Sequence, residues 1–102
     1  MVRQILIIAD IIDLNDGNLI LGVSLGDFES KEIHQLKSNT EVKNEFVGKF
    51  LLFDRTKVSG KIEIIDVQIT SSIVDFKNIF FKVKKTKKVE ALKVLDEVSI
   101  NM

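Results

Sequence analysis

The clearest pattern in the chain is the alternation of large apolar residues with smaller or polar ones over residues 19–25. Four apolar residues fall on one side of an extended chain: Leu19, Leu21, Val23 and Leu25. This is typical of a half-buried β-strand. Asp16-Gly17 separates this strand from an earlier apolar run, and both residue types tolerate the positive φ angles of a primed turn. The sequence therefore predicts a β-hairpin formed by residues 2–14 and 19–28.

Two glycines lie on the other side of this strand. Gly22 and Gly26 leave bare backbone there, which is expected where a sheet bends or where another segment comes close. We therefore expect this face to bend, to close a barrel corner or to be crossed closely by another part of the chain.

Further strands are predicted at residues 46–54, 61–70, 79–84 and 94–100. The first two are expected to pair as a second hairpin. Within residues 61–70 the apolar phase switches after Ile64, and a β-bulge or burial of both faces explains such a switch. Near the C-terminus, Val89, Leu92 and Leu95 also have the spacing of a short helix, but the strand is favoured.

Residues 29–46 are polar and contain few apolar anchors. Ser30 has the right chemistry to cap a short helix over residues 31–37, with Ile33 and Leu36 facing inward. The alternative is a long excursion between strands, and long loops in small domains often carry binding residues.

Together these elements predict a β-dominated α+β domain. We expect about six mostly antiparallel strands in a bent sheet or partly open barrel, with one or two short helices, and no segment repeats another. The predicted core consists of Leu6, Ile8, Leu21, Val23, Phe50, Leu52, Ile62, Ile64, Val67, Ile69, Phe81, Val83 and Val98.

Composition places limits on this picture. With 102 residues, 45% of them hydrophobic and 29% charged, the chain has the size and balance of one folded domain spanning residues 1–102. It has no cysteine, so a disulfide framework, a thiolate zinc site and a catalytic thiol are excluded. The apolar stretch at residues 5–9 is too short for a membrane span or a signal peptide, so we expect a cytoplasmic protein.

The charges balance overall but are distributed unevenly. Residues 77–102 carry seven lysines and three acids, a net charge of +4, which leaves −4 on residues 1–76. Nucleic-acid-binding sheets combine outward aromatics with lysines, and a candidate set of this kind is Phe80, Lys82, Lys84, Lys85, Lys87 and Lys88. In a strand, however, only Phe80 lies with the lysines. The favoured interpretation is that Phe81 and Val83 enter the core while the lysines protect an edge or a solvated face.

Catalytic and metal-binding patterns are weak. His34 is the only histidine and has no apparent partner, so we expect a plain surface residue. Asp10, Asp13 and Asp16 suggest a calcium loop, but the register fails because Ile12 takes the first ligand position. The glycines lack the residues of a phosphate-binding loop. We therefore predict a non-enzymatic protein with no cofactor and no metal.

One local resemblance supports a barrel-like architecture. The segment ALKVLDEVSI (91–100) resembles a strand of the small β-barrel domain of translation GTPases, and DGNLILGVSLG (16–26) resembles that domain's glycine-bearing hairpin. A glycine of the family pattern is replaced by Leu95 here.

By elimination, the predicted function is binding to another macromolecule. The first hypothesis is a small bacterial immunity or antitoxin protein whose carboxylates contact a basic toxin domain such as a nuclease. The residues expected to do so are Asp10, Asp13, Asp16, Asp27, Glu29 and Glu32. The alternatives are a nucleic-acid- or ribosome-binding β-barrel that uses the lysine cluster, and a subunit of a larger assembly.

Overall fold

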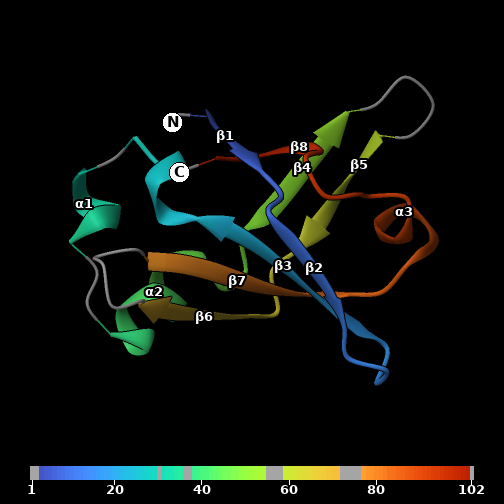
Figure 1. Ribbon diagram of the computed structural model, residues 1–102, viewed down its shortest axis with the longest axis horizontal. Coiled ribbons are helices and arrows are strands. Elements are labelled where there is room, and N and C mark those ends of the chain that lie inside the picture. The colour runs from blue at the N-terminus through green and yellow to red at the C-terminus, as the bar shows by residue number, and fades with distance from the viewer. Residues whose placement is uncertain (1–2, 30, 36–37, 55–58, 72–76, 102) are drawn as a thin grey trace.

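The computed structural model describes residues 3–29, 31–35, 38–54, 59–71 and 77–101 (Figure 1). Eight strands occur within these residues: β1 (Arg3–Ile7), β2 (Asp10–Asp13), β3 (Asn18–Ser24), β4 (Phe50–Asp54), β5 (Ser59–Glu63), β6 (Asp66–Ser71), β7 (Lys77–Lys84) and β8 (Glu97–Asn101). The helical segments are the 3-10 turn η1 (Leu25–Asp27), α1 (Lys31–His34), α2 (Asn39–Phe46) and α3 (Lys87–Glu90).

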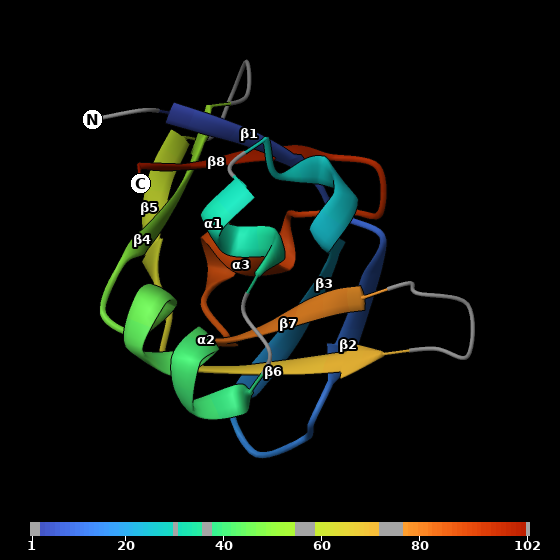
Figure 2. The same ribbon diagram turned by 90° about the vertical axis from the view of Figure 1, so that its left-hand side faces the viewer.

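The strands form two antiparallel sheets. The first sheet has the order β1-β8-β4-β5 and the second the order β2-β3-β7-β6. Figure 2 shows the two sheets wrapped around a common interior, with α1 and α2 at the end nearest the viewer. The predicted hairpins are confirmed by the pairing of β2 with β3 and of β4 with β5. The fold is broadly α+β and strand-rich as predicted, but it has two sheets and no closed barrel.

Two predicted strands are each divided between the sheets, which raises the predicted six strands to eight. The chain leaves the first sheet after β1 and enters the second with β2, and it does the same between β5 and β6. The phase switch after Ile64 therefore has neither of the two predicted causes, a bulge or burial of both faces of one strand. Ile64 is buried and Ile65 is exposed because the chain changes sheets there.

Backbone hydrogen bonds fix the first crossing. The Ile8 N–H donates to the Asp96 carbonyl at 3.0 Å, and the Ile8 carbonyl accepts from the Leu95 N–H at 2.8 Å. The next N–H, of Ala9, donates to the Gly22 carbonyl in the second sheet at 2.8 Å. Neighbouring residues thus bond to different sheets.

The second crossing repeats this pattern. The Ile64 N–H donates to the Lys49 carbonyl at 2.9 Å, the Ile64 carbonyl accepts from the Gly48 N–H at 3.0 Å, and the Ile65 N–H donates to the Lys82 carbonyl at 2.9 Å. Gly48 and Leu95 both have positive φ, +88° and +78°. Glycine adopts this conformation freely, whereas it costs a leucine about 1–2 kcal/mol.

The molecule is consequently built from two similar halves. Strands β1 to β4 correspond to β5 to β8. When every strand is exchanged for its counterpart, each sheet keeps the same order, read from the opposite edge. The sequences also correspond: ILIIADI (5–11) aligns with KIEIIDV (61–67), and NLILGV (18–23) with NIFFKV (78–83). The expectation that no segment repeats another is wrong, since the repeat is a pattern of core positions with few identities.

The core lies between the sheets and follows this correspondence. Most of the predicted core residues are buried, including Leu6 with its counterpart Ile62 and Leu21 with its counterpart Phe81. Three predictions are corrected: Phe50 is exposed, and Leu52 and Ile69 are only partly buried. In β4 the inward residues are Leu51 and Phe53. Pairing with β5 and β8 turns these side chains inward and the predicted Phe50 and Leu52 outward.

Helix α2 was not predicted. The Ser38 hydroxyl accepts a hydrogen bond from the Glu41 N–H and so starts this helix just after the predicted one. Phe46, predicted to begin a strand, ends α2 and packs its ring against Phe28 and Phe81. The first part of the predicted helix over residues 31–37 is present as α1, and residues 36–37 lie outside the described residues.

The predicted C-terminal strand is confirmed as β8, which begins at Glu97 and not at residue 94. The short helix suggested by Val89 is α3, and it ends before Leu92. No helix in the described part of the chain is long and apolar enough to cross a membrane.

The crossings generate a stability prediction. Ile64→Ala should lower the free energy of unfolding by about 2–5 kcal/mol, because it empties space between the sheets. Ile65→Ala, at the adjacent position that is 44% exposed, should change it by less than about 0.5 kcal/mol. Urea denaturation of both variants measures the difference, and equal losses would contradict the described crossing.

Candidate functional site

The six acidic residues predicted to bind a partner fall into two groups. Asp10 and Asp13 bound β2, and Asp16 lies in the turn that follows it. Asp27 ends η1, Glu29 follows it and Glu32 lies in α1. Figure 1 shows the β2–β3 turn and α1 at opposite ends of the molecule, so the structure does not gather all six at one point. The first group, Asp10, Asp13 and Asp16, is called the hairpin acids below.

Each of the hairpin acids also accepts a local backbone hydrogen bond. Asp10 accepts from the Ile11 N–H, Asp13 from the Asn15 N–H and Asp16 from the Asn18 N–H, at 2.9–3.0 Å. The bonds of Asp13 and Asp16 shape the turn in the way that Asp side chains commonly do, whereas the bond of Asp10 lies at the start of β2. All three residues are nevertheless exposed, so a partner could reach their carboxylates from solvent.

Asp13 is paired with a lysine from the basic segment. Lys85 Nζ lies 2.7 Å from Asp13 Oδ2 and 3.6 Å from Glu90 Oε1. The hydrogen bond from Lys85, followed by that from the Asn15 N–H, lowers the pKa of Asp13 below its usual value. The bond to Asp13 in turn raises the pKa of Lys85. One lysine of the predicted cluster is therefore neutralised by carboxylates.

The other members of the predicted lysine cluster lie in two places. Phe80, Lys82 and Lys84 share the outer face of the second sheet, as predicted, while Phe81 and Val83 are fully buried. Because β7 has neighbours on both sides, the lysines do not protect a sheet edge and instead cover a solvated face. Lys87 and Lys88 belong to α3.

Phe80 crosses the sheet over a glycine. A Cβ atom at Gly22 would lie 2.9 Å from the Phe80 ring, closer than real Cβ contacts. Of the three alternatives predicted for this face, a close approach is thus found at Gly22, and it partly buries Phe80, the aromatic residue of the predicted lysine cluster. Beside it, Asp66 pairs with Lys43 at 3.4 Å and also feels the charge of Lys82.

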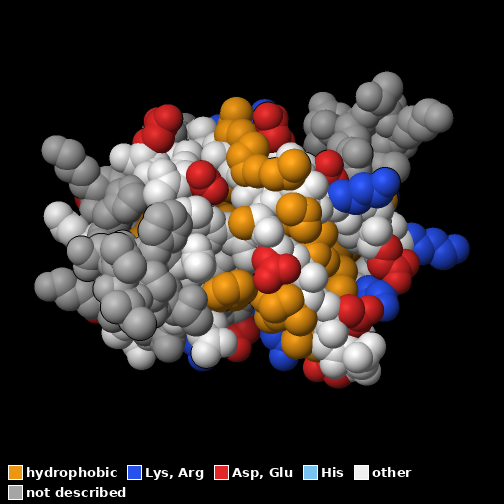
Figure 3. Space-filling model, viewed as in Figure 1, with side chains coloured by type: hydrophobic (Ala, Val, Ile, Leu, Met, Phe, Trp, Pro, Cys, Tyr) orange, Lys and Arg blue, Asp and Glu red, His pale blue; other side chains and the backbone are white. Residues whose placement is uncertain are grey.

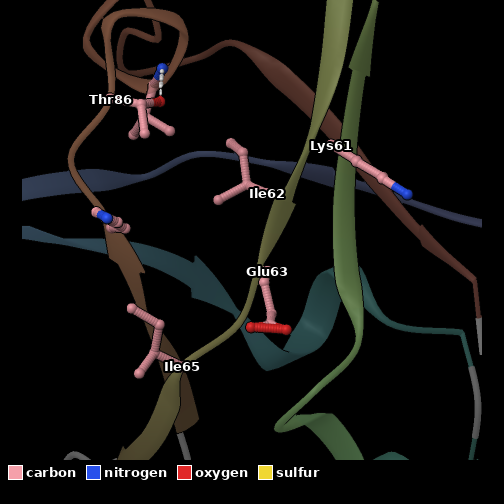
Figure 4. A pocket seen from close by; sticks show the side chains of 7 residues that line it. Lys61, Ile62, Glu63, Ile65 and Thr86 are labelled. Carbon is pink, nitrogen blue, oxygen red and sulfur yellow. Dashed lines mark hydrogen bonds between the residues drawn. The ribbon is translucent and has the colours of Figure 1, made fainter.

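A small pocket lies between β5 and α3 (Figure 4). Its volume is about 220 Å³, and its lining consists of Lys61, Ile62, Glu63, Ile65, Lys84, Thr86 and Val89. Ile62 and Ile65 point toward the β7–α3 connection, whereas Lys61 points away from it. The Thr86 hydroxyl accepts from the Val89 N–H, so its main role is to start α3. The pocket is shallow and mostly apolar.

Exposed apolar side chains form a band over β1 and β2. Figure 3 shows this band with acidic groups within it and beside it. The large exposed residues on this part of the chain are Ile5, Ile12 and Leu14. Leu95, which is 76% exposed, donates its backbone N–H to Ile8 in the crossing between β1 and β2. Sequence reasoning missed this band because alternation predicts which face is buried, not which outward residues gather.

The described residues include no group of three or more His, Cys, Asp or Glu side chains placed to hold a metal ion. His34 ends α1, and its side chain lies outside the described residues, so the prediction of a plain surface histidine remains a prediction.

Comparisons with known proteins identify no relative. No family model, no curated protein and no solved structure matches the chain. Function therefore has to be argued from the surfaces described above.

The Asp13–Lys85 pair generates a pH prediction. Because the pKa of folded Asp13 is lowered, its contribution to stability is present above the unfolded pKa of about 3.9 and is lost as the pH falls through the folded value. Asp13→Asn should therefore lower the melting temperature slightly at pH 7 and have little effect near pH 2. Lys85 has a raised pKa, so its contribution is lost only as the pH rises through that higher value.

Thermal melts at several pH values measure this effect. Asp16→Asn is the matched control, since it changes the same turn without touching Lys85. Equal, pH-independent effects of the two substitutions would show that the ion pair contributes nothing to stability, as has been found for some exposed pairs.

Proposed function

We propose that the protein is a non-enzymatic protein-binding module, of the kind represented by small bacterial immunity and antitoxin proteins. Its partner would be a basic protein, such as a toxin domain that acts on nucleic acid. The carboxylates of this chain would take the place of the phosphates that such a toxin contacts.

The observation that carries the proposal is the apolar band beside the hairpin acids. Protein interfaces combine an apolar centre with a polar rim. Ile5 in β1 and Ile12 in β2 are exposed, Leu95 is bonded to Ile8 between these strands, and Asp10 and Asp13 lie at the ends of β2. Figure 3 shows acidic groups within and beside the apolar band. Apolar patches of this kind on a small protein mark interaction sites more often than chance.

The distribution of acids narrows the proposed interface. Asp10, Asp13 and Asp16 belong to one hairpin, whereas Asp27, Glu29 and Glu32 lie near α1. A single small partner would engage the hairpin acids most directly. The second group would contribute to long-range attraction, which speeds association more than it strengthens binding.

Charge reversal tests this function. The partner to use is the purified product of the gene beside that of this chain, if it is basic and arrests growth when expressed alone. We expect coexpression to restore growth, and Asp13→Lys with Asp16→Lys to weaken binding by about tenfold or more. Glu63→Lys, on the other sheet, is the matched control. No binding, or equal losses for control and hairpin variants, would refute the proposal.

A second candidate function is nucleic-acid binding through the lysine cluster. The observation in its favour is that Phe80, Lys82 and Lys84 share one outward face of the second sheet. Against it, Lys85 is held by Asp13 and Glu90, and Asp66 lies beside Lys82. The local positive charge is thereby reduced, and with it the attraction for phosphates.

A salt series separates the two functions. If the lysine face binds nucleic acid, a fluorescent single-stranded RNA should bind more weakly as salt rises and should lose affinity with Lys82→Glu and Lys84→Glu. The protein-binding proposal predicts no such loss, because any weak binding would be non-specific. Fluorescence anisotropy measures both, with Lys93→Glu, at an exposed residue outside the second sheet, as the control.

A further inference from the structure

The two halves of the molecule differ mainly in the connection before their last strand. Residues 25–49 join β3 to β4, whereas residues 85–96, about half as many, join β7 to β8. The longer connection includes α2, which packs against β6. The counterpart of β6 is β2, and no helix within the described residues makes comparable contact with it.

The uncovered strand is measurably less buried than its counterpart. Val67 in β6 is 1% exposed, whereas Ile11, which occupies the same position in β2, is only partly buried. Leu95, the counterpart of Gly48, donates its N–H to the Ile8 carbonyl in the crossing just before this strand, is 76% exposed and has a φ of +78°. A leucine that is both strained and exposed at a position suited to glycine points to a contact that lies outside the chain.

The covered half shows what kind of element fits. In α2, Val42 and Phe46 are completely buried and stand four residues apart, as on one face of an amphipathic helix. Lys43 on the same helix pairs with Asp66 at 3.4 Å. The counterpart of Asp66 is Asp10, which accepts the same local bond from the next N–H. Within the described residues Asp10 forms no ion pair.

We infer that the free side of β2 is a docking site for an amphipathic helix of the partner. Ile11 and Leu95 receive two apolar side chains spaced four residues apart, and Asp10 pairs with a lysine or arginine on the same helix. The site repeats between two proteins the contact that α2 makes with β6 inside one. This inference rests on the proposed function, since it specifies the element by which a basic protein binds.

A peptide copy of α2 is the probe for this site. Residues 38–49, amidated at the C-terminus, are titrated to millimolar concentration into nitrogen-15-labelled full-length protein. Amide shifts should appear at Asp10, Ile11 and Leu95. Shifts confined to Val67 and its neighbours would mean that the peptide replaces α2 in its own place, and that result, or the absence of shifts, overturns the inference.

Charge exchange tests the ion pair. Asp10→Lys should weaken peptide binding by about three- to tenfold, and a peptide carrying Lys43→Glu should recover the loss. Asp16→Lys changes the charge of the same hairpin by the same amount and should leave peptide binding nearly unchanged. Equal effects of the two hairpin variants, or no recovery with the exchanged peptide, would show that the peptide is attracted by the overall charge and does not pair with Asp10.

Leu95→Gly separates a binding role from a structural one. It should raise the melting temperature, because glycine relieves the positive φ, and yet weaken peptide binding by about threefold or more. Unchanged peptide binding overturns the role of Leu95. Shifts at the same amides on raising the protein concentration without peptide would identify a second copy of the chain as the occupant and overturn the assignment to a partner helix.

The outcome is distinguishable from failure of the proposed function. Suppose that the natural partner binds and that Asp13→Lys with Asp16→Lys weakens its binding, while Asp10→Lys and Leu95→Gly do not. The protein-binding function is then supported and the helix-docking site is refuted.

Discussion

The fold depends on two points at which a continuous extended chain passes from one sheet to the other. At each point an isoleucine with no exposed surface, Ile8 or Ile64, uses both its N–H and its carbonyl to bond the segment that precedes the last strand of a half. An unpaired backbone group buried there would cost about 1–3 kcal/mol. The hydrogen bonds therefore tie the two sheets together and determine where β4 and β8 begin.

The same constraint explains why the halves are similar in framework and different at the surface. The four strands of each half repeat because both crossings need the same partners. The segment between the third and fourth strands of each half is free to vary as long as it returns to the crossing. The longer version covers β6 with α2, and the shorter one leaves β2 open. The two halves therefore differ at the surface chiefly because their connections differ in length.

The fold also redistributes charge. The sequence separates a basic C-terminal part from an acidic remainder, and the fold places Lys85 of the basic part against Asp13 of the remainder, whereas the Lys43–Asp66 pair lies within the remainder. Pairing between distant segments thus brings opposite charges together at Lys85. In the proposed function, recognition would rest on a local apolar and acidic surface more than on attraction of polyanions from a distance.

The sequence alone determined the hairpins, the strand-rich class and most of the core, because alternation and turn chemistry act within a few neighbouring residues. It correctly separated Phe81 from Phe80 and foresaw a close approach at Gly22. Only the tertiary structure decided that residues 2–14 and 61–70 each serve two sheets, that Leu51 and not Leu52 faces inward, and that Leu95 stands exposed beside β2. These features depend on hydrogen bonds and packing between segments far apart in the chain, which no local pattern records.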